Sequence, residues 1–264
     1  MPLDDLTLWG NYDKVEVAIE RLRRFEPDDG YYLAYSGGKD STVILELARM
    51  AGVQFEAHHN LTTADPPEVV RFVKGQPEII IDRPEETMWQ LIVRKGIPPT
   101  RRIRYCCKKL KEHGGAGRTV ITGVRWAESS RRKKTREVIE GCNRYDRMVV
   151  NPIIDWTDYE AWEFIKQRRL SYCSLYDEGF KRTGCILCPM GRRKQRLRQA
   201  DRWPKYYQQY LRTFTRMLKR RRMLGREPFY RATPQTAQGV MDWWLSDQAR
   251  VSKEQMLLFD QGER

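Results

Sequence analysis

Short apolar segments of two kinds alternate along the first 170 residues of the chain. Runs of three to five apolar residues, such as 31–35 and 79–81, have the length of short buried strands. Between them, segments such as 42–50 and 158–169 repeat apolar residues at spacings of three and four, which is typical of amphipathic helices. Strands that alternate with helices of this length predict a parallel sheet with crossover helices. We therefore expect an α/β fold with strands at 31–35, 55–61, 78–82, 118–122 and 148–152.

The alternation stops after residue 170. A loop that contains three cysteines is followed by apolar and aromatic residues at helical spacing, which predicts one long helix over 195–223. The aromatic residues could form a stacking platform for nucleic-acid bases, but their spacing gives one continuous face, so we interpret this face as core. The face consists of Trp203, Tyr206, Tyr207, Tyr210, Phe214, Met217 and Leu218.

These patterns predict three parts: an N-terminal helix within 1–28, an α/β domain over 29–172, and a C-terminal region over 173–264. No apolar run reaches 18 residues, so we expect no transmembrane helix. The first ten residues carry Asp4 and Asp5 and lack the basic start and apolar stretch of a signal peptide. We therefore expect a cytoplasmic protein.

Positive charge is concentrated in the C-terminal region. The formal net charge of the chain is +14, and residues 181–226 hold 16 basic residues against one acidic residue, Asp201. A local excess of this kind favours a polyanionic partner, because Lys and Arg that neutralise phosphates release counterions. The alternative is a solvated basic helix face. We expect nucleic acid to bind the basic helical C-terminal region.

The turn after the first expected strand reads Ser36-Gly37-Gly38-Lys39-Asp40-Ser41, and a helix follows it. Two glycines let backbone N–H groups approach an anion closely, and the helix N-terminus adds a partial positive charge. Lys39 supplies a full charge and the serine hydroxyls supply hydrogen bonds. The spacing differs from the common phosphate-loop and dinucleotide-binding motifs. We therefore predict a phosphate-binding loop of another type.

This turn and five later segments resemble the PP-loop ATP pyrophosphatase superfamily, and within it the phosphoadenosine-phosphosulfate (PAPS) reductase family. The later segments are 62–68, 122–132, 151–157, 175–180 and 184–190, in the family's order. The resemblance covers about residues 30–192 and implies an adenine nucleotide alpha-hydrolase-like (HUP) parallel sheet. It implies that a nucleotide contacts Ser36, Gly37, Gly38, Lys39, Asp40, Ser41, Gly123, Arg125, Ser129 and Arg132.

Six cysteines occur, and four of them form two short motifs: Cys106-Cys107 and Cys185-x-x-Cys188. Four thiolates from two segments can enclose a soft metal centre. Zinc is the alternative, but adjacent ligands are awkward around one small tetrahedral ion. The layout also resembles the [4Fe–4S]-binding pattern of assimilatory adenylylsulfate reductases, so we expect a [4Fe–4S] cluster here. We interpret the remaining two, Cys142 and Cys173, as structural.

Two departures from the reductases of this family decide the expected reaction. Those reductases resemble one another in a catalytic cysteine near the C-terminus, whereas residues 189–264 contain no cysteine. The turn with Lys39 and Asp40 is more similar to that of ATP-cleaving relatives. The resemblance thus implies cleavage of ATP, bound with Mg²⁺, to AMP and pyrophosphate. Lys39 and Arg125 would neutralise the leaving group, and Asp40 would orient the metal or the nucleotide.

Together, an ATP site, a cluster and a basic region are similar to enzymes that put sulfur into nucleic acids, including the sulfur-incorporating subunit of DNA phosphorothioation systems. We therefore expect adenylation of an acceptor, nucleic acid, for sulfur transfer, with a sulfur or electron donor protein as a further partner. One alternative is an adenylylsulfate or PAPS reductase. Another is a non-enzymatic, nucleotide-sensing protein that binds nucleic acid. The sequence indicates no oligomeric state.

Overall fold

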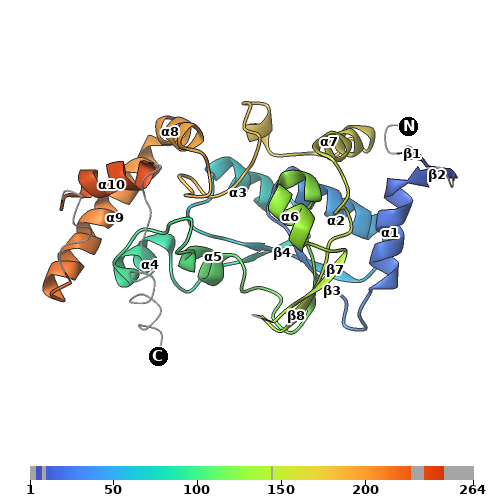
Figure 1. Ribbon diagram of the computed structural model, residues 1–264, viewed down its shortest axis with the longest axis horizontal. Helices are drawn as coiled ribbons and strands as arrows, with labels where there is room; N and C mark the ends of the chain where they lie inside the picture. The colour runs from blue at the N-terminus through green and yellow to red at the C-terminus, as the bar shows by residue number, and fades with distance from the viewer. Residues whose placement is uncertain (1–3, 8–9, 144, 227–234, 247–264) are drawn as a thin grey trace. The chain divides into compact units, whose positions relative to one another are not determined.

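The computed structural model describes residues 4–7, 10–143, 145–226 and 235–246. Contacts divide the chain into two compact units (Figure 1). The first, here called the α/β unit, comprises the described residues within Met1–Asn60, Pro67–Asp82 and His113–Thr183. The second, here called the helical unit, comprises those within Leu61–Pro66, Arg83–Glu112 and Gly184–Arg264.

A six-stranded sheet forms the centre of the α/β unit. Its order is β5 (Ile79–Asp82), β4 (Phe55–Asn60), β3 (Tyr31–Ala34), β6 (Thr119–Ile121), β8 (Arg147–Val150) and β7 (Ile139–Cys142). The first five strands are parallel, and β7 is antiparallel to β8 at one edge. The α/β fold and its five parallel strands are thus confirmed, each strand within two residues of its expected bounds. The edge strand β7 was not predicted, because its four residues show no apolar alternation.

Three helices of the α/β unit pack side by side: α1 (Lys14–Arg24), α2 (Lys39–Ala51) and α7 (Asp158–Gln167). Local signals set their ends. Asp13 caps α1 and Thr157 caps α7 through their side-chain oxygens, and Gly52 ends α2 with φ +69°. The shorter elements are β1 (Asp4–Thr7), β2 (Gly10–Asp13), α3 (Pro67–Lys74), η1 (Trp126–Glu128), α6 (Ser130–Thr135) and η2 (Ser174–Tyr176).

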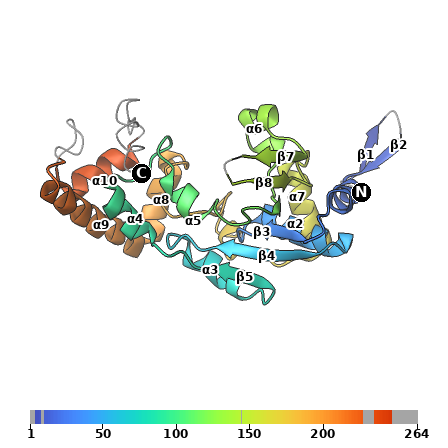
Figure 2. The same ribbon diagram turned by 90° about the horizontal axis from the view of Figure 1, so that it is seen from below.

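The helical unit contains α4 (Met88–Lys95), α5 (Tyr105–Leu110), α8 (Arg193–Arg202), α9 (Pro204–Met223) and α10 (Ala237–Leu245), and α9 packs against both α4 and α10 (Figure 2). Tyr210 of α9 is 1% exposed, with its ring centroid 4.8 Å from those of Trp89 and Trp244. Most of the predicted aromatic face is therefore core, with Tyr206 and Tyr207 only half-buried. None of the described helices is long and apolar enough to cross a membrane.

Two expectations differ from the structure. The single helix over 195–223 is wrong: α8 ends at Arg202 and α9 begins at Pro204. Proline has no N–H to continue the helical ladder, and it disfavours helical angles in the residue before it, so Trp203 takes φ −126° and ψ 68°. The second difference is the division of the chain. Residues 83–112, expected in the α/β domain, group with the C-terminal region because α4 packs on α9.

Candidate functional site

The 36–41 turn connects β3 to α2 in the α/β unit, and Lys39 is the first residue of α2. Gly37 has φ +71°, a value that L side chains rarely adopt. A Cβ on Gly37 would lie 2.9 Å from Val69 Cγ1 and from Val73 Cγ2 of α3. The glycine therefore allows both the left-handed turn and the close packing of the turn on α3.

The serine hydroxyls hold the turn together. Ser41 Oγ accepts a hydrogen bond from Gly38 N at 3.1 Å and donates one to Gly38 O at 2.8 Å. Ser36 Oγ donates to Ser41 Oγ at 3.2 Å. The backbone N–H of Lys39 donates to the Tyr176 hydroxyl at 2.9 Å. Tyr176 thus occupies the kind of position, an oxygen on a helix N-terminal N–H, that a phosphate oxygen takes in an anion site.

Two buried cations and two carboxylates form a cluster beside this turn. Arg125, 2% exposed, donates from Nε to Asp40 Oδ1 at 2.8 Å and from Nη2 to Asp158 Oδ1 at 2.9 Å. Lys39 Nζ lies 3.1 Å from Asp40 Oδ2 and 3.0 Å from Asp158 Oδ1. The structure therefore brings together the three predicted catalytic residues, Lys39, Asp40 and Arg125, and adds Asp158 to them.

The cluster keeps its cations charged. Burial acts to lower the pKa of Lys39, but the carboxylates of Asp40 and Asp158 outweigh it, so the pKa lies above its ordinary value. The pKa of Arg125 is raised by the same balance. Burial acts to raise the pKa of Asp158, but hydrogen bonds from Lys39 and Arg125 outweigh it and lower that pKa. Lys39 and Arg125 therefore keep their protons, and Asp158 its negative charge, near neutral pH.

The other predicted nucleotide contacts lie on the segment after β6. A Cβ on Gly123 would lie 3.0 Å from the Cβ and the backbone of Asp40, so this glycine permits close approach to the first turn of α2. Ser129 caps α6 by accepting a hydrogen bond from Arg132 N at 3.2 Å, and Arg132 forms an ion pair with Glu128. The roles of Ser129 and Arg132 toward a nucleotide stay predictions.

Two residues of this site were not singled out from the sequence. Asp158 was considered only as the start of a helix, and Tyr176 only as part of a family segment. One signal was available for Asp158: it follows Thr157, the N-cap of α7, shortly after strand β8. Ligand sites of parallel sheets lie beyond the carboxyl ends of the strands, so polar residues in such a position are candidates.

The four cysteines of the two motifs line one cavity of about 30 Å³ in the helical unit. Around them the cavity is mainly apolar, with Met88, Pro99, Tyr210 and Trp244 in its lining. Cys185 Sγ donates to Thr62 Oγ1 at 3.3 Å. Cys142 and Cys173 belong instead to the α/β unit, where Cys173 is buried and Cys142 is half-buried. The structure therefore brings the two cysteine motifs together in one cavity, and Cys142 and Cys173 do not line it.

The thiols differ in acidity. A hydrogen bond with Cys106 lowers the pKa of Cys107 below its usual range, and Arg104 contributes to this shift. Burial raises the pKa of Cys185 to about 12. Among the residues that the structure describes, no group of three or more His, Cys, Asp or Glu side chains could hold a metal ion. A metal centre at this cavity would therefore require the thiols to move from these positions. In donor chemistry, four thiols in an apolar lining suit a soft metal or an iron–sulfur cluster.

The profile of the phosphoadenosine phosphosulfate reductase domain matches residues 30–191. The chain belongs to the phosphoadenosine phosphosulfate reductase family. This match begins just before β3 and contains the 36–41 turn, the Lys39–Arg125 cluster and all four cysteines of the thiol cavity.

Individual relatives cover parts of the chain. An uncharacterized protein of Methanocaldococcus jannaschii is 29% identical over 189 residues, which cover 67% of this chain and 46% of that protein. The adenosine 5'-phosphosulfate reductase of Oceanobacillus iheyensis is 29% identical over 151 residues, or 55% of this chain and 62% of that protein. The chain spans about half the length of the curated relatives it matches. The PAPS reductase of Candida auris, solved as a phosphate complex, matches 64% of this chain and 87% of its own at 20% identity, with a TM-score of 0.47.

Proposed function

We propose that this protein cleaves ATP to AMP and pyrophosphate and transfers the AMP to an acceptor, nucleic acid, which is thereby activated for sulfur transfer. The observation that carries the proposal is the pair of buried cations, Lys39 and Arg125, beside the glycine turn at the start of α2. Preorganised cations in a water-poor site stabilise charge that develops on a leaving phosphate far better than cations in water.

In the proposed step an oxygen of the acceptor attacks the α-phosphorus of ATP. The bond from that phosphorus to the α,β-bridging oxygen breaks, and pyrophosphate leaves with the bond's electron pair. Lys39 lies 3.1 Å from Asp40 Oδ2, and Arg125 Nε lies 2.8 Å from Asp40 Oδ1. When pyrophosphate leaves, both cations would exchange these carboxylate oxygens for the departing phosphate oxygens. The acceptor then carries AMP. Hydrosulfide attacks the acceptor atom that bears the adenylated oxygen, the bond from that atom to the oxygen breaks, and AMP leaves with the bond's electron pair.

Mg²⁺ bound with ATP would find its protein ligands in Asp40 and Asp158. Sites for this ion commonly combine one or two carboxylates with phosphate oxygens and water. Both carboxylates now accept from Lys39 and Arg125, so transfer of these cations to the phosphates would release oxygen ligands for the metal. The exchange preserves charge balance, which is expensive to violate in a partly buried site.

The thiol cavity supports the sulfur-transfer half of the proposal. Cys106, Cys107, Cys185 and Cys188 would hold a [4Fe–4S] cluster, which would supply one-electron redox chemistry to the sulfur-transfer step. The basic helical unit supports nucleic acid as the acceptor, because its residues 184–226 hold 14 basic residues against one acidic residue.

Reduction of adenosine 5'-phosphosulfate is the second candidate, favoured by the names of several relatives. A reductase of this kind needs a thiol that attacks the sulfonyl sulfur. Of the two cysteines outside the four-thiol cavity, Cys173 is buried and Cys142 is half-buried, so Cys142 would have to serve. This requirement makes the ATP reaction the better candidate.

The test is to incubate the anaerobically purified protein with Mg²⁺ and ATP labelled at the α-phosphate, with and without single-stranded DNA. We expect pyrophosphate release that increases with DNA, and label in the DNA fraction when no sulfur donor is present. Lys39→Met should lower the release by about a hundredfold or more, the usual effect of losing one group that stabilises transition-state charge. Lys74→Met removes an equal charge at the exposed end of α3 and should change nothing.

The alternatives give different results in the same assay. Sulfite from adenylylsulfate and a thiol reductant, without pyrophosphate from ATP, would show a reductase. Nucleic-acid binding with no turnover in the wild-type protein would show a regulator. Equal pyrophosphate release by the wild type and by Lys39→Met would remove the proposed site.

A further inference from the structure

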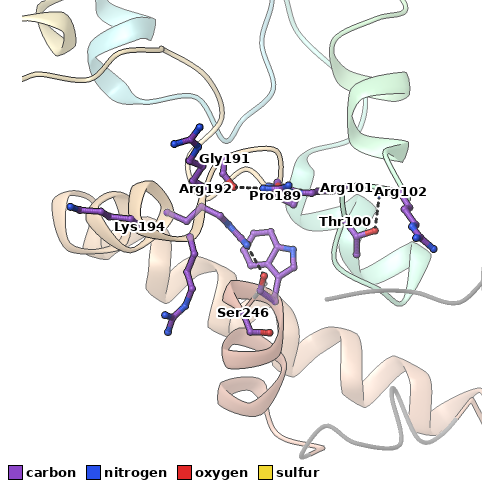
Figure 3. Close-up of a pocket in the computed structure, with 11 residues that line it drawn as sticks. Thr100, Arg101, Arg102, Pro189, Gly191, Arg192, Lys194 and Ser246 are labelled. Atoms are coloured by element: carbon purple, nitrogen blue, oxygen red, sulfur yellow. Dashed lines mark hydrogen bonds between the residues drawn. The ribbon is translucent and has the colours of Figure 1, made fainter. Parts of the chain in front are cut away.

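A second hollow of the helical unit has not entered the proposed reaction. It is a pocket of about 620 Å³ lined by six cationic side chains and no carboxylate (Figure 3). The six are Arg101, Arg102, Arg192, Arg193, Lys194 and Arg196. Its volume is that of a ligand site. Six like charges around one hollow repel one another, so the arrangement favours an anionic occupant.

Two of the six cations are fixed by hydrogen bonds to the pocket wall. Arg101 donates from Nε to Pro189 O at 3.0 Å and from Nη2 to Gly191 O at 3.3 Å, so it joins the two sides of the pocket. Arg196 is 4% exposed, and its guanidinium lies 4.7 Å from the Trp244 ring centroid while Nη1 donates to Trp244 O at 2.7 Å. The positive charge is thus preorganised before any ligand binds.

Three further cations are exposed at the start of α8. Arg192 is the N-cap residue, and Arg193 and Lys194 open the helix, whose first turn contains no acidic residue. Cations at a helix N-terminus are unfavourable, because the helix dipole is positive there. No side-chain hydrogen bond caps this end. The electrostatic energy at the start of α8 is therefore unfavourable in the free protein, and a bound anion would make it favourable.

We propose that this pocket binds the phosphodiester backbone of a single nucleic-acid strand. Six cations exceed what one phosphate group requires, whereas a strand presents one charge per nucleotide. A second groove of the same unit, of about 550 Å³, is lined by Arg94, Arg216 and Arg220, of which Arg94 forms an ion pair with Glu86.

The place of the pocket agrees with the nucleic acid being the acceptor. Pro189 and Trp244 line both this pocket and the four-thiol cavity, so the two hollows adjoin within the helical unit. A strand held in the pocket would therefore lie next to the thiols. The identity of the strand as acceptor rests on the proposed function, but its binding to the pocket does not.

The test measures binding of a fluorescently labelled 20-nucleotide single-stranded DNA by anisotropy, without ATP, over a series of salt concentrations. The variant Arg192→Gln/Arg193→Gln/Lys194→Gln removes three exposed charges from the pocket. The matched control Arg71→Gln/Lys74→Gln/Lys166→Gln removes three exposed charges from the α/β unit. We expect the pocket variant to raise Kd at least tenfold at low salt. The slope of log K against log salt should fall by about 2, since each phosphate contact contributes about 0.7 for single strands.

A second readout locates the strand directly. DNA that carries 4-thiothymidine should photo-crosslink to peptides around residues 100–102 and 189–196 in the wild-type protein, and the pocket variant should lose these crosslinks. Equal Kd and slope in the pocket variant and the wild type would overturn the proposal. It would also be overturned if the wild type bound inorganic pyrophosphate, and the pocket variant lost that binding while its affinity for DNA stayed unchanged. DNA binding that needs the pocket, without pyrophosphate release from ATP, would refute the proposed function and leave this inference standing.

Discussion

Arg125 Nε donates a hydrogen bond of 2.8 Å to Asp40 Oδ1, although the two residues are 85 positions apart in the chain. The same guanidinium also reaches Asp158 Oδ1 at 2.9 Å and Trp156 O at 3.3 Å. One side chain thereby joins the segment after β6, the first turn of α2 and the start of α7. The polar centre of the α/β unit depends on it.

Replacing Arg125 should therefore destabilise the protein. Arg125→Met removes one of the two cations that Asp40 and Asp158 share, whereas Lys39 stays bonded to both. Because the Asp158 side chain is 68% exposed, we expect a loss of about 1–3 kcal/mol in the free energy of unfolding. Arg125→Lys keeps the positive charge but not the planar guanidinium that bonds two carboxylates. Its loss of stability should therefore lie between those of the wild type and Arg125→Met. Urea unfolding measures both. The control is Arg24→Met at an exposed position of α1. If Arg125→Met loses no more stability than this control, Arg125 does not hold the three segments together.

Gly37 and Gly52 offer a matched pair of glycine substitutions. Both have positive φ, +71° and +69°, but only at Gly37 would a Cβ meet neighbours, whereas Gly52 has nothing within 4 Å. Gly52→Ala should therefore cost only the left-handed backbone conformation, about 1–2 kcal/mol. Gly37→Ala should cost more and should also weaken ATP binding. Thermal unfolding and a nucleotide titration check this, and equal losses would show that contact with α3 is unimportant.

Glu46 of α2 should make stability depend on pH. It accepts hydrogen bonds from Arg49 and Arg168. Burial acts to raise its pKa, but the two arginines outweigh burial and lower it. Because the folded pKa is below the unfolded value of about 4.3, the contribution of Glu46 is present above that value and is lost as pH falls through the folded pKa.

The measurement is urea unfolding of the wild type and of Glu46→Gln between pH 3 and pH 7. The variant should be less stable by about 1 kcal/mol at pH 7, the upper end for ion pairs with exposed partners, and the difference should shrink toward pH 3. Glu20→Gln, at an exposed position of α1, should show no such trend. A difference that stays constant with pH would mean that the carboxylate charge of Glu46 is unimportant.

The cysteines should separate into two classes by metal content. Anaerobically purified wild-type protein should contain iron and acid-labile sulfide and absorb near 400 nm. Single substitutions of Cys106, Cys107, Cys185 or Cys188 by serine should lower the iron content, because these thiols share one cavity. Cys142→Ser and Cys173→Ser should keep it. Zinc without iron in the wild type would contradict the cluster and leave the cavity as a thiolate zinc site.

The sequence predicted most of the sheet because four of its five parallel strands, β3, β5, β6 and β8, contain short apolar runs that are recognised locally. Strand β7 was not predicted because an edge strand needs no apolar run. In β7, Ile139 and Cys142 are separated by a glutamate and a glycine. The break in the basic helix was visible as Pro204, but the apolar spacing continues across it, and that periodicity outweighed the proline in the prediction.

The site was predictable where a motif is contiguous and less so where the chain folds back. Residues 36–41 form one turn, so Lys39 and Asp40 could be assigned together. Asp158 enters the cluster only through the sheet order that places β8 beside β6. The grouping of residues 83–112 with the helical unit likewise depends on contact between α4 and α9, which no local pattern shows.

The split thiol cavity has a consequence for synthesis of the chain. Cys107 and Cys185 are 78 residues apart, and at about 5–20 residues per second the ribosome needs roughly 4–16 s to make that interval. During this time the adjacent pair Cys106-Cys107 has left the ribosome before its partners exist. These two thiols would be exposed to oxidants and to stray metal ions in the nascent chain. Assembly of the cavity in a cell therefore depends on whether residues 108–188 are synthesised before the two thiols are oxidised or bind a metal ion. Oxygen tension should influence the yield of intact protein.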